Sequence, residues 1–337
     1  MDIKIVDVAA RAGVSTATVS RVFNHSTGVT AKTKQRVMQA IEELGYHPNA
    51  TAKNLRSQKT LTIAVIVPDI NVAYFTEIIK GIENMAYLKN YKLLICDAEN
   101  QKSKELDYLN LLMNRTVDAA ILIAPLLSDD EIRGISDQGY IVAVIGRYIE
   151  HKSIPCIYTD NIKFSLTVMR HLFACGHRDI VFLNGYAESM DSVERLEGYT
   201  QALQQHDIPY RPELIESGNF NERGGYEAIH RLLDKGITFS AVFAANDEMA
   251  LGVYKACREH GLSIPEQVAV VGVDNNRISE YISPAMSTVN QPKYTMGIML
   301  AEKLIDLMND NEFADRRTFK VNSELLIRAS SNFKREV

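Results

Sequence analysis

Hydrophobic residues recur at helical spacing in the first part of the chain. The apolar positions of the first predicted helix share one face: Ile5, Val8, Ala9 and Ala12. Gly13 follows, where a turn requires a residue that tolerates positive φ, and Ser15 is a suitable N-cap for a second helix ending at Phe23. A third helix is predicted over 32–44, with an inner stripe of Val37, Met38, Ile41 and Leu44.

The spacing of small and apolar residues across the first two helices is typical of a helix-turn-helix. Ala9 is small where the helices would cross, Gly13 lies in the turn, and Val19 is an apolar anchor on the second helix. A three-helix bundle without a ligand is the alternative, because alanine and glycine at such positions are common in helical hairpins. The pattern therefore predicts an N-terminal all-α domain that could bind DNA.

From residue 61 onward, short apolar runs alternate with helical patterns. The predicted strands of the first half are 61–68, 92–98, 118–124 and 141–146, and its helices are 74–88, 103–113 and 129–138. The rhythm restarts after residue 160, with strands at 179–185, 240–245 and 268–273 and helices at 164–175, 193–206, 224–235 and 248–260. This order predicts two similar α/β halves with parallel sheets flanked by helices, which bind small molecules in the cleft between them.

Charge is distributed unevenly along the chain. Residues 1–60 contain nine Lys and Arg against four Asp and Glu, a net charge of +5, whereas the whole chain carries −5, so the remainder carries −10. A basic module on an acidic body is the arrangement expected of a protein that docks one end on phosphates. The charge distribution favours DNA binding over the ligand-free bundle.

The second helix presents side chains that suit base edges and phosphates. Its outward residues are Thr16, Ala17, Thr18, Ser20 and Arg21, and Asn24 follows them. Hydroxyls, amides and guanidinium groups donate to both kinds of acceptor, whereas Ala17 offers only a methyl contact. We expect these residues to form the DNA-binding surface of the first domain.

Four motifs in the same order give the chain a resemblance to the LacI/GalR family of transcription regulators over essentially its whole length. They are DVAARAGVSTATVSRVFN, GYHPNATAKNLRSQKT, ANDEMALG and GVDNN. The resemblance implies that Thr16, Ala17 and Arg21 face bases in the major groove. It also implies that the segment from Pro48 to Arg56 is a hinge helix that folds only against its dimer mate on the operator, since nine residues are too few to hold a helix alone.

Within this implied hinge helix, Leu55 would wedge into the minor groove, and Arg56 would hold nearby phosphate or the groove. An ordinary linker is the alternative for this segment. The implied layout is a helix-turn-helix domain at 1–47, a hinge helix and linker at 48–60, and a periplasmic-binding-protein-like effector domain at 61–337. Its N-subdomain would comprise 61–161 and 292–321, and its C-subdomain 162–291 and 322–337.

The resemblance also implies an effector site at the ends of predicted strands. Aromatic residues would pack on the effector, namely Tyr74, Phe75 and Phe220, and polar residues would hydrogen-bond to it, namely Arg147, Arg195, Asn246, Asp274 and Gln291. These groups match the vicinal hydroxyls and apolar face of a sugar, and the two arginines also suit a sugar acid or sugar phosphate. The alternatives are a core position for Phe220, a turn or N-cap role for Asp274, and a surface ion pair for Arg195.

Several function classes are disfavoured by what the sequence lacks. No run approaches the roughly 18 apolar residues of a membrane span, and the start has no secretory pattern, so a cytoplasmic protein is expected. The four cysteines are scattered, and we expect no disulfide. No catalytic motif or metal-ligand spacing occurs, so neither an enzyme, a metal site nor a cofactor is expected.

Two hypotheses then compete. The first is a DNA-binding regulator, a homodimer on a pseudo-palindromic operator and a repressor released by a sugar-type inducer. The second is a solute-binding protein of the transport type, which shares the two-lobed fold but has no use for a basic helix-turn-helix domain. A sugar-processing enzyme on a related scaffold is weaker still. The first sixty residues favour the regulator.

Overall fold

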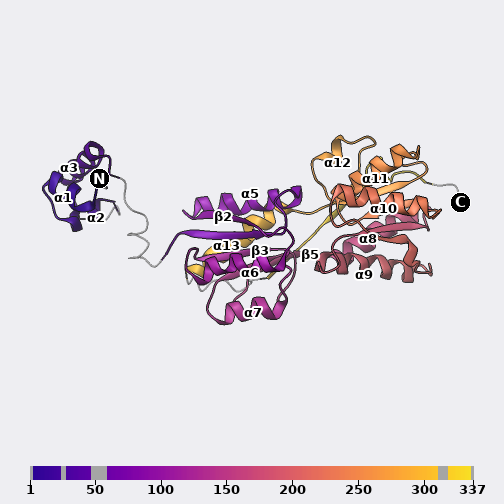
Figure 1. Ribbon diagram of the computed structural model, residues 1–337, viewed down its shortest axis with the longest axis horizontal. Coiled ribbons are helices and arrows are strands. Elements are labelled where there is room, and N and C mark those ends of the chain that lie inside the picture. The colour runs from indigo at the N-terminus through magenta and orange to yellow at the C-terminus, as the bar shows by residue number, and fades with distance from the viewer. Residues whose placement is uncertain (1–2, 24–27, 47–58, 310–317, 335–337) are drawn as a thin grey trace. The chain divides into compact units, whose positions relative to one another are not determined.

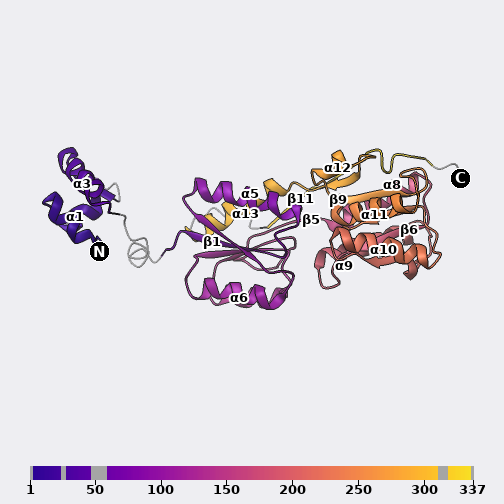
Figure 2. The ribbon, with the colours of Figure 1, turned by 45° about the horizontal axis from the view of Figure 1, so that its top comes forward.

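The protein divides into two compact units, Met1–Thr60 and Leu61–Val337. The computed structural model describes residues 3–23, 28–46, 59–309 and 318–334. The first unit contains helices α1 (Ile5–Ala12), α2 (Thr16–Phe23) and α3 (Ala31–Leu44). The second contains two α/β lobes, shown from two directions in Figure 1 and Figure 2.

The three helices of the first unit enclose a small apolar core. Val8, Val19 and Val37 are fully buried, one from each helix. Gly13 ends α1 in the left-handed conformation with φ 63°, and the Ser15 hydroxyl accepts a hydrogen bond from the Thr18 amide (3.2 Å), as expected of a helix start.

One position of the predicted inner stripe on α3 is wrong. Met38 is 51% exposed, and Ala40 is buried in its place. Ile41 and Leu44 pack at the edge of the core with Val37. The inward-facing positions 37, 40, 41 and 44 follow three- and four-residue spacing, so Met38 lies one residue off this face.

The first lobe of the second unit is built on a parallel six-stranded sheet. Its strand order is β11-β5-β4-β3-β1-β2. The strands are β1 (Thr62–Val67), β2 (Lys92–Asp97), β3 (Ala119–Ile123), β4 (Val142–Ile145), β5 (Cys156–Thr159) and β11 (Thr318–Val321). Its helices are α5 (Ala73–Leu88), α6 (Lys102–Met113), α7 (Asp129–Asp137) and α13 (Lys293–Met308). β1, β3 and β4 are almost wholly buried, as the continuous apolar runs predict.

The second lobe repeats this plan with strand order β12-β10-β9-β8-β6-β7. The strands are β6 (Ile180–Asn184), β7 (Ile215–Ser217), β8 (Ala241–Ala244), β9 (Ala269–Asp274), β10 (Ser287–Asn290) and β12 (Glu324–Leu326). The helices are α8 (Asn161–Ala174), α9 (Met190–Gln205), α10 (Glu222–Asp234), α11 (Asp247–Glu259), the short α12 (Ile278–Tyr281) and a 3-10 turn, η1 (Pro212–Leu214). Only β12 runs antiparallel among the paired strands described. The predicted fold class, a helical domain followed by two parallel sheets flanked by helices, is confirmed.

The chain passes between the two lobes after β5, after β10 and after β11, because each of these strands is followed by an element of the other lobe. The helix after the second passage, α13, packs closely against α5 of the first lobe. A Cβ atom at Gly81 of α5 would overlap the backbone carbonyl oxygen of Tyr294, and one at Gly297 would overlap that of Ile78. This close approach fixes the first turn of α13 beside the passage.

Candidate functional site

The outward side of α2 carries the residues predicted to contact DNA. Thr16, Ala17 and Arg21 are exposed, whereas Thr18 and Ser20 are half-buried. The predicted contacts Asn24, Leu55 and Arg56 lie outside the described residues. The exposed side chains of α2 form a polar strip on the first unit.

Two other arginines of the first unit have structural partners. Arg36 donates to the Ala12 carbonyl from Nε (3.1 Å) and Nη2 (2.6 Å) and to the Gly13 carbonyl (3.0 Å), which fastens α3 to the turn. Arg11 forms an ion pair with Glu43 (2.5 Å). The carbonyl contacts of Arg36 hold the turn that orients α2.

A cavity lies between the two lobes of the second unit, at the carboxyl ends of the parallel strands. It holds about 760 Å³ of empty space, part of which is open to solvent. Six of the eight predicted effector residues line it: Tyr74, Phe75, Arg195, Phe220, Asn246 and Asp274. Seven further polar or aromatic lining residues were not assigned from the sequence: Asp69, Asn100, Tyr186, Ser189, Asp191, Asn219 and Asn221. They follow strands or begin helices, which is the signal that could have identified them.

Aromatic pairs form opposing walls of this cavity. Tyr74 and Phe75 of α5 meet edge to face with ring centroids 5.3 Å apart, and Tyr186 and Phe220 of the second lobe do so at 6.1 Å. Phe220 has φ 54°, and a Cβ atom at Gly185 would overlap its ring. Phe220 also packs against the core of its lobe. It is therefore both a core residue and a lining residue of the cavity.

Arg195 projects from α9 into the cavity wall and is only 4% exposed, which excludes a surface ion pair. Its Nε donates to Asn161 Oδ1 (2.9 Å) and its Nη1 to the Ala245 carbonyl. The guanidinium lies 5.4 Å from the Phe164 ring centroid and 5.8 Å from that of Phe220. Protein partners therefore hold the guanidinium in place before any ligand arrives.

The side chain of Asn246 shapes the cavity. Its Oδ1 accepts from the Met249 amide (2.9 Å) as the N-cap of α11, and its Nδ2 donates to the Phe220 carbonyl (3.0 Å). Both ends of the amide thus bind protein groups. The residue positions the Phe220 loop and the start of α11 on the same wall.

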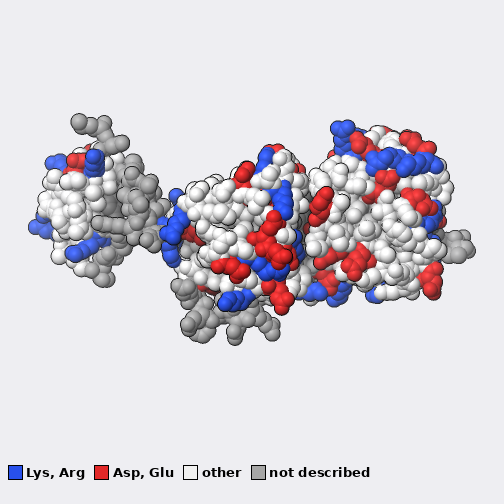
Figure 3. Space-filling model, turned by 60° about the horizontal axis from the view of Figure 1, so that its bottom comes forward, with Lys and Arg blue, Asp and Glu red and all other residues white. Residues whose placement is uncertain are grey.

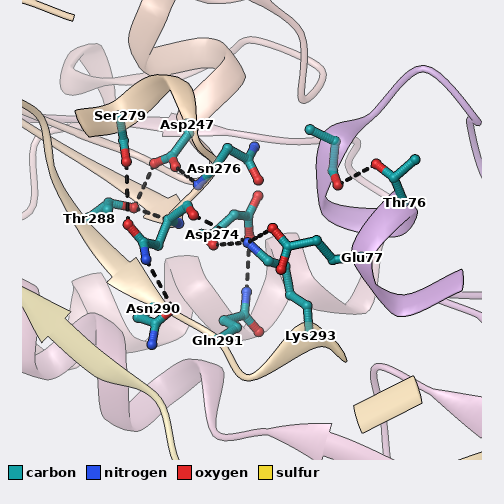
Figure 4. Close-up of polar contacts among 12 residues, drawn as sticks. Thr76, Glu77, Asp247, Asp274, Asn276, Ser279, Thr288, Asn290, Gln291 and Lys293 are labelled. Atoms are coloured by element: carbon teal, nitrogen blue, oxygen red, sulfur yellow. Dashed lines mark hydrogen bonds and ion pairs between the residues drawn. The ribbon is translucent and has the colours of Figure 1, made fainter. Parts of the chain in front are cut away.

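Gln291 and Asp274 connect the cavity to the passages between the lobes. Gln291 Nε2 donates to Asp274 Oδ1 (2.9 Å), as Figure 4 shows. Gln291 Oε1 accepts from Thr159 Oγ1 (2.8 Å) and lies 3.5 Å from the Tyr74 hydroxyl. Gln291 therefore lies behind the lining residues and links Asp274 of one lobe to Tyr74 of the other.

Lys293, which the sequence analysis did not single out, is buried at the first residue of α13 with 2% exposure. Its Nζ donates to the carbonyls of Asp274 and Asn275 (3.4 Å for the latter) and lies 3.4 Å from Glu77 Oε1 (Figure 4). Its position just after the passage between the lobes at Gln291 is the feature of the sequence that could have identified it. Lys293 joins the end of β9 to α5 across the lobes.

Two buried carboxyl groups share this region. Burial raises the pKa of Asp274 to about 7, although the positive charges of Arg195 and Lys293 oppose the shift. Burial and the nearby Asp274 raise the pKa of Asp247 well above its usual value, against hydrogen bonds from Thr288 Oγ1 (2.6 Å) and the Asn276 amide (2.7 Å). The region is strongly desolvated before a ligand binds.

Arg147 does not line the main cavity. Its guanidinium donates to the Pro125 (3.1 Å) and Leu127 carbonyls and forms an ion pair with Asp129 Oδ1 (3.0 Å). It borders a smaller neighbouring cavity that Asp191 also lines. Its partners hold the loop between β3 and α7.

The described residues contain neither a metal-binding cluster nor a membrane-spanning helix. Among them, no three His, Cys, Asp or Glu side chains are grouped so as to hold a metal ion. No helix of the described chain is long and apolar enough to cross a membrane. All four cysteines, at 96, 156, 175 and 257, are buried and free.

Comparisons with known proteins match both units. Residues 4–49 match the model of bacterial regulatory proteins of the lacI family, and residues 169–331 match a periplasmic binding protein-like domain. The chain is 37% identical to the HTH-type transcriptional regulator AscG of Escherichia coli (strain K12) over 97% of each chain.

Solved structures agree with these matches. The transcriptional regulator CelR in complex with cellobiose is 30% identical, with a TM-score of 0.73 over 97% of this chain and 99% of that one. The lac repressor dimer bound to operator and an anti-inducer is 25% identical, with a TM-score of 0.88 over 98% and 99%.

Proposed function

Because the chain belongs to the lacI family of DNA-binding transcription regulators, which are not enzymes, we propose that it is a cytoplasmic repressor controlled by a sugar bound between the lobes of its second unit. The observation that carries the proposal is the cavity with its opposed aromatic walls and fixed polar groups. A solute-binding protein of the transport type would share this cavity, but it would not need the helix-turn-helix unit.

On the DNA side, the proposal assigns base and phosphate contacts to residues on and after α2. They are Thr16, Ala17, Thr18, Ser20, Arg21 and Asn24, with Leu55 as a minor-groove wedge and Arg56 on phosphate. Two such units in a homodimer would read a pseudo-palindromic operator. The similarity to a repressor dimer bound to operator supports this arrangement.

On the effector side, the proposal assigns ring stacking to Tyr74, Phe75 and Phe220. Arg195 and Asp274 would hydrogen-bond to hydroxyl groups of the sugar. Arg195 has N–H groups that do not take part in its bonds to Asn161 and Ala245, and Asp274 has a second carboxyl oxygen that does not bind Gln291. Asn246, Gln291 and Arg147 would act by positioning, through the partners described above. The cellobiose bound by a similar regulator supports a sugar of this kind.

The contacts across the lobes suggest how binding changes DNA affinity. A sugar that touches Tyr74 and Asp274 would act on both ends of the Gln291 link, and the adjacent Lys293 joins β9 to α5. A ligand that favours one arrangement of the lobes shifts the population toward it. We propose that the sugar-bound arrangement holds the two DNA-binding units of the dimer less favourably, so the sugar induces.

The test is operator binding with and without sugar. An operator is first selected from random duplexes with the full-length protein, and gel shifts are then run with cellobiose, ribose and glucose. Release of the operator by one of them supports the proposal. Tighter binding would reverse the sign of regulation, and failure to select any duplex would overturn the DNA-binding role.

A matched variant tests the wedge. Leu55→Ala should weaken operator binding far more than binding to random DNA, because only the operator complex uses an inserted side chain. Equal losses on both duplexes would contradict a wedge at this position. Met38→Ala, at an exposed site on α3, is the control for a general effect on the first unit.

A further inference from the structure

The charge on the walls of the cavity limits the effector it can hold. Among the described residues, the carboxylates of Asp69 and Asp191 and the buried carboxyl group of Asp274 line it, against a single cation, Arg195. On the face shown in Figure 3, acidic and basic side chains both lie along the boundary between the lobes, so the preference must come from the cavity walls themselves. We infer that the effector is a neutral or amine-bearing sugar, that sugar acids and sugar phosphates are excluded, and that Asp191 is the residue that determines this preference. The inference rests on the sugar-binding function proposed above.

The cations near the cavity are already committed to protein groups. Arg195 is hydrogen-bonded to Asn161 and Ala245, and its Nη2 lies 3.8 Å from Asp191 Oδ1. Arg147 is paired with Asp129 outside the main cavity, and Lys293 is turned toward backbone carbonyls and Glu77. Among the described residues that line the cavity, an anionic ligand would therefore meet one guanidinium, that of Arg195, whose charge Asp191 already offsets.

Asp191 lies in the first turn of α9, whose amino end would otherwise attract an anion. Its Oδ1 accepts from Asn161 Nδ2 (3.0 Å), and the same amide donates to Glu194 Oε2 (2.8 Å). The Asp191 side chain is 20% exposed and lines both the main and the smaller cavity. The Asp191 carboxylate thus occupies the helix end that a phosphate or sugar carboxylate would need, and Glu194 lies beyond the first turn of the same helix.

Asp69 adds negative charge from the opposite lobe. Its Oδ1 accepts from the Asn71 amide (2.9 Å) and Nδ2 (3.0 Å), so its second oxygen is the one open to a donor. Burial raises the pKa of Tyr186, and the negative charge of Asp69 adds to this shift. The charge of Asp69 therefore acts on the opposite wall of the cavity. Ligand ammonium or hydroxyl groups would donate to Asp69 on one lobe and to Asp191 on the other.

The experiment is calorimetric titration of the full-length protein at low salt near neutral pH. The neutral probes are cellobiose, ribose and glucose, the cationic probe is glucosamine, and the anionic probes are glucuronate, glucose 6-phosphate and ribose 5-phosphate. We expect at least one neutral or cationic probe to bind, and each anionic probe to bind at least about 100-fold more weakly than its neutral counterpart. Added salt should reduce the difference in affinity between the anionic and the neutral probes, because it screens the charges.

The variant Asp191→Asn keeps the shape of the side chain and removes its charge. It should raise affinity for the anionic probes about tenfold or more and lower that for glucosamine, whereas Asp137→Asn, at a 70% exposed carboxylate outside the cavity, should change neither. The inference is overturned, with sugar binding intact, if a sugar acid or phosphate binds the wild type as tightly as its neutral counterpart, or if Asp191→Asn leaves the order of affinities unchanged. If none of the probes binds, the proposed sugar-binding function fails and the inference falls with it.

Discussion

The substitution Asp274→Asn should stabilise the protein at neutral and alkaline pH. Asp274 is 4% exposed, and burial raises its pKa to about 7. The folded state therefore binds a proton that the unfolded chain releases near its ordinary pKa of 3.8. This contribution to stability is present below the unfolded pKa and is lost as pH rises through the folded one.

The size of the loss follows from the shift. A change from 3.8 to about 7 corresponds to about 4 kcal/mol in the free energy of unfolding, of which about 3 kcal/mol is lost between pH 5 and pH 8. The amide oxygen of asparagine can still accept from Gln291 Nε2, and Lys293 donates to the backbone of residue 274 rather than to its side chain. The substitution therefore removes the charge and keeps these contacts.

The assay is urea denaturation of the full-length wild type and variant at pH 5 and pH 8, followed by circular dichroism. The stability difference in favour of the variant should grow by about 3 kcal/mol between the two pH values. Asp107→Asn, at an exposed carboxylate on α6, should show no such growth. An Asp274→Asn variant whose pH dependence matches the wild type would refute the reasoning, because the carboxylate would then cost nothing on burial.

The remaining predictions concern other parts of the chain. Gly81→Ala should lower the free energy of unfolding by about 1–3 kcal/mol, because its Cβ atom meets the backbone of α13, whereas Gly134→Ala on α7, with nothing within 4 Å, should be neutral or stabilising; thermal denaturation of both variants checks this. Asn246→Ala should cost about 1 kcal/mol as a lost N-cap and weaken binding of the sugar probes by releasing Phe220, and intact probe binding would contradict the positioning role. Arg21→Ala should lower the salt slope of operator binding by about one unit or relax one base preference, and a variant with neither change would exclude the residue from the interface.

The periodicity of the sequence was sufficient for most of the fold. Buried strands such as β1 and β3 are continuous apolar runs, and long helices such as α5 have a regular apolar stripe. The strands that were not predicted, β5, β7, β10, β11 and β12, have three or four residues each, and several are half-exposed. Segments of three or four residues are too short to show a hydrophobic periodicity that identifies a strand. Their conformation is decided by the neighbouring strands in the sheet.

The candidate site was predictable in its position and much less so in its chemistry. Residues that follow strands meet at one edge of a parallel sheet, and the family resemblance assigned Tyr74, Arg195 and Asp274 to a common site there. Their local partners depend on groups that are distant in sequence. Gln291 is paired with Thr159, 132 positions away, and Asn246 is turned to the Phe220 carbonyl, 26 positions away.

The sequence by itself therefore determined the division into a basic helical unit and an acidic two-lobed unit, because periodicity, charge and motif order are local properties of the chain. Only the tertiary structure decided which charges face the cavity. It turned Arg147 to Asp129, buried Lys293 between the lobes, and left Asp69 and Asp191 on opposite walls. The electrostatic character of a site is a sum over groups brought together by folding, and that sum cannot be read from spacing along the chain.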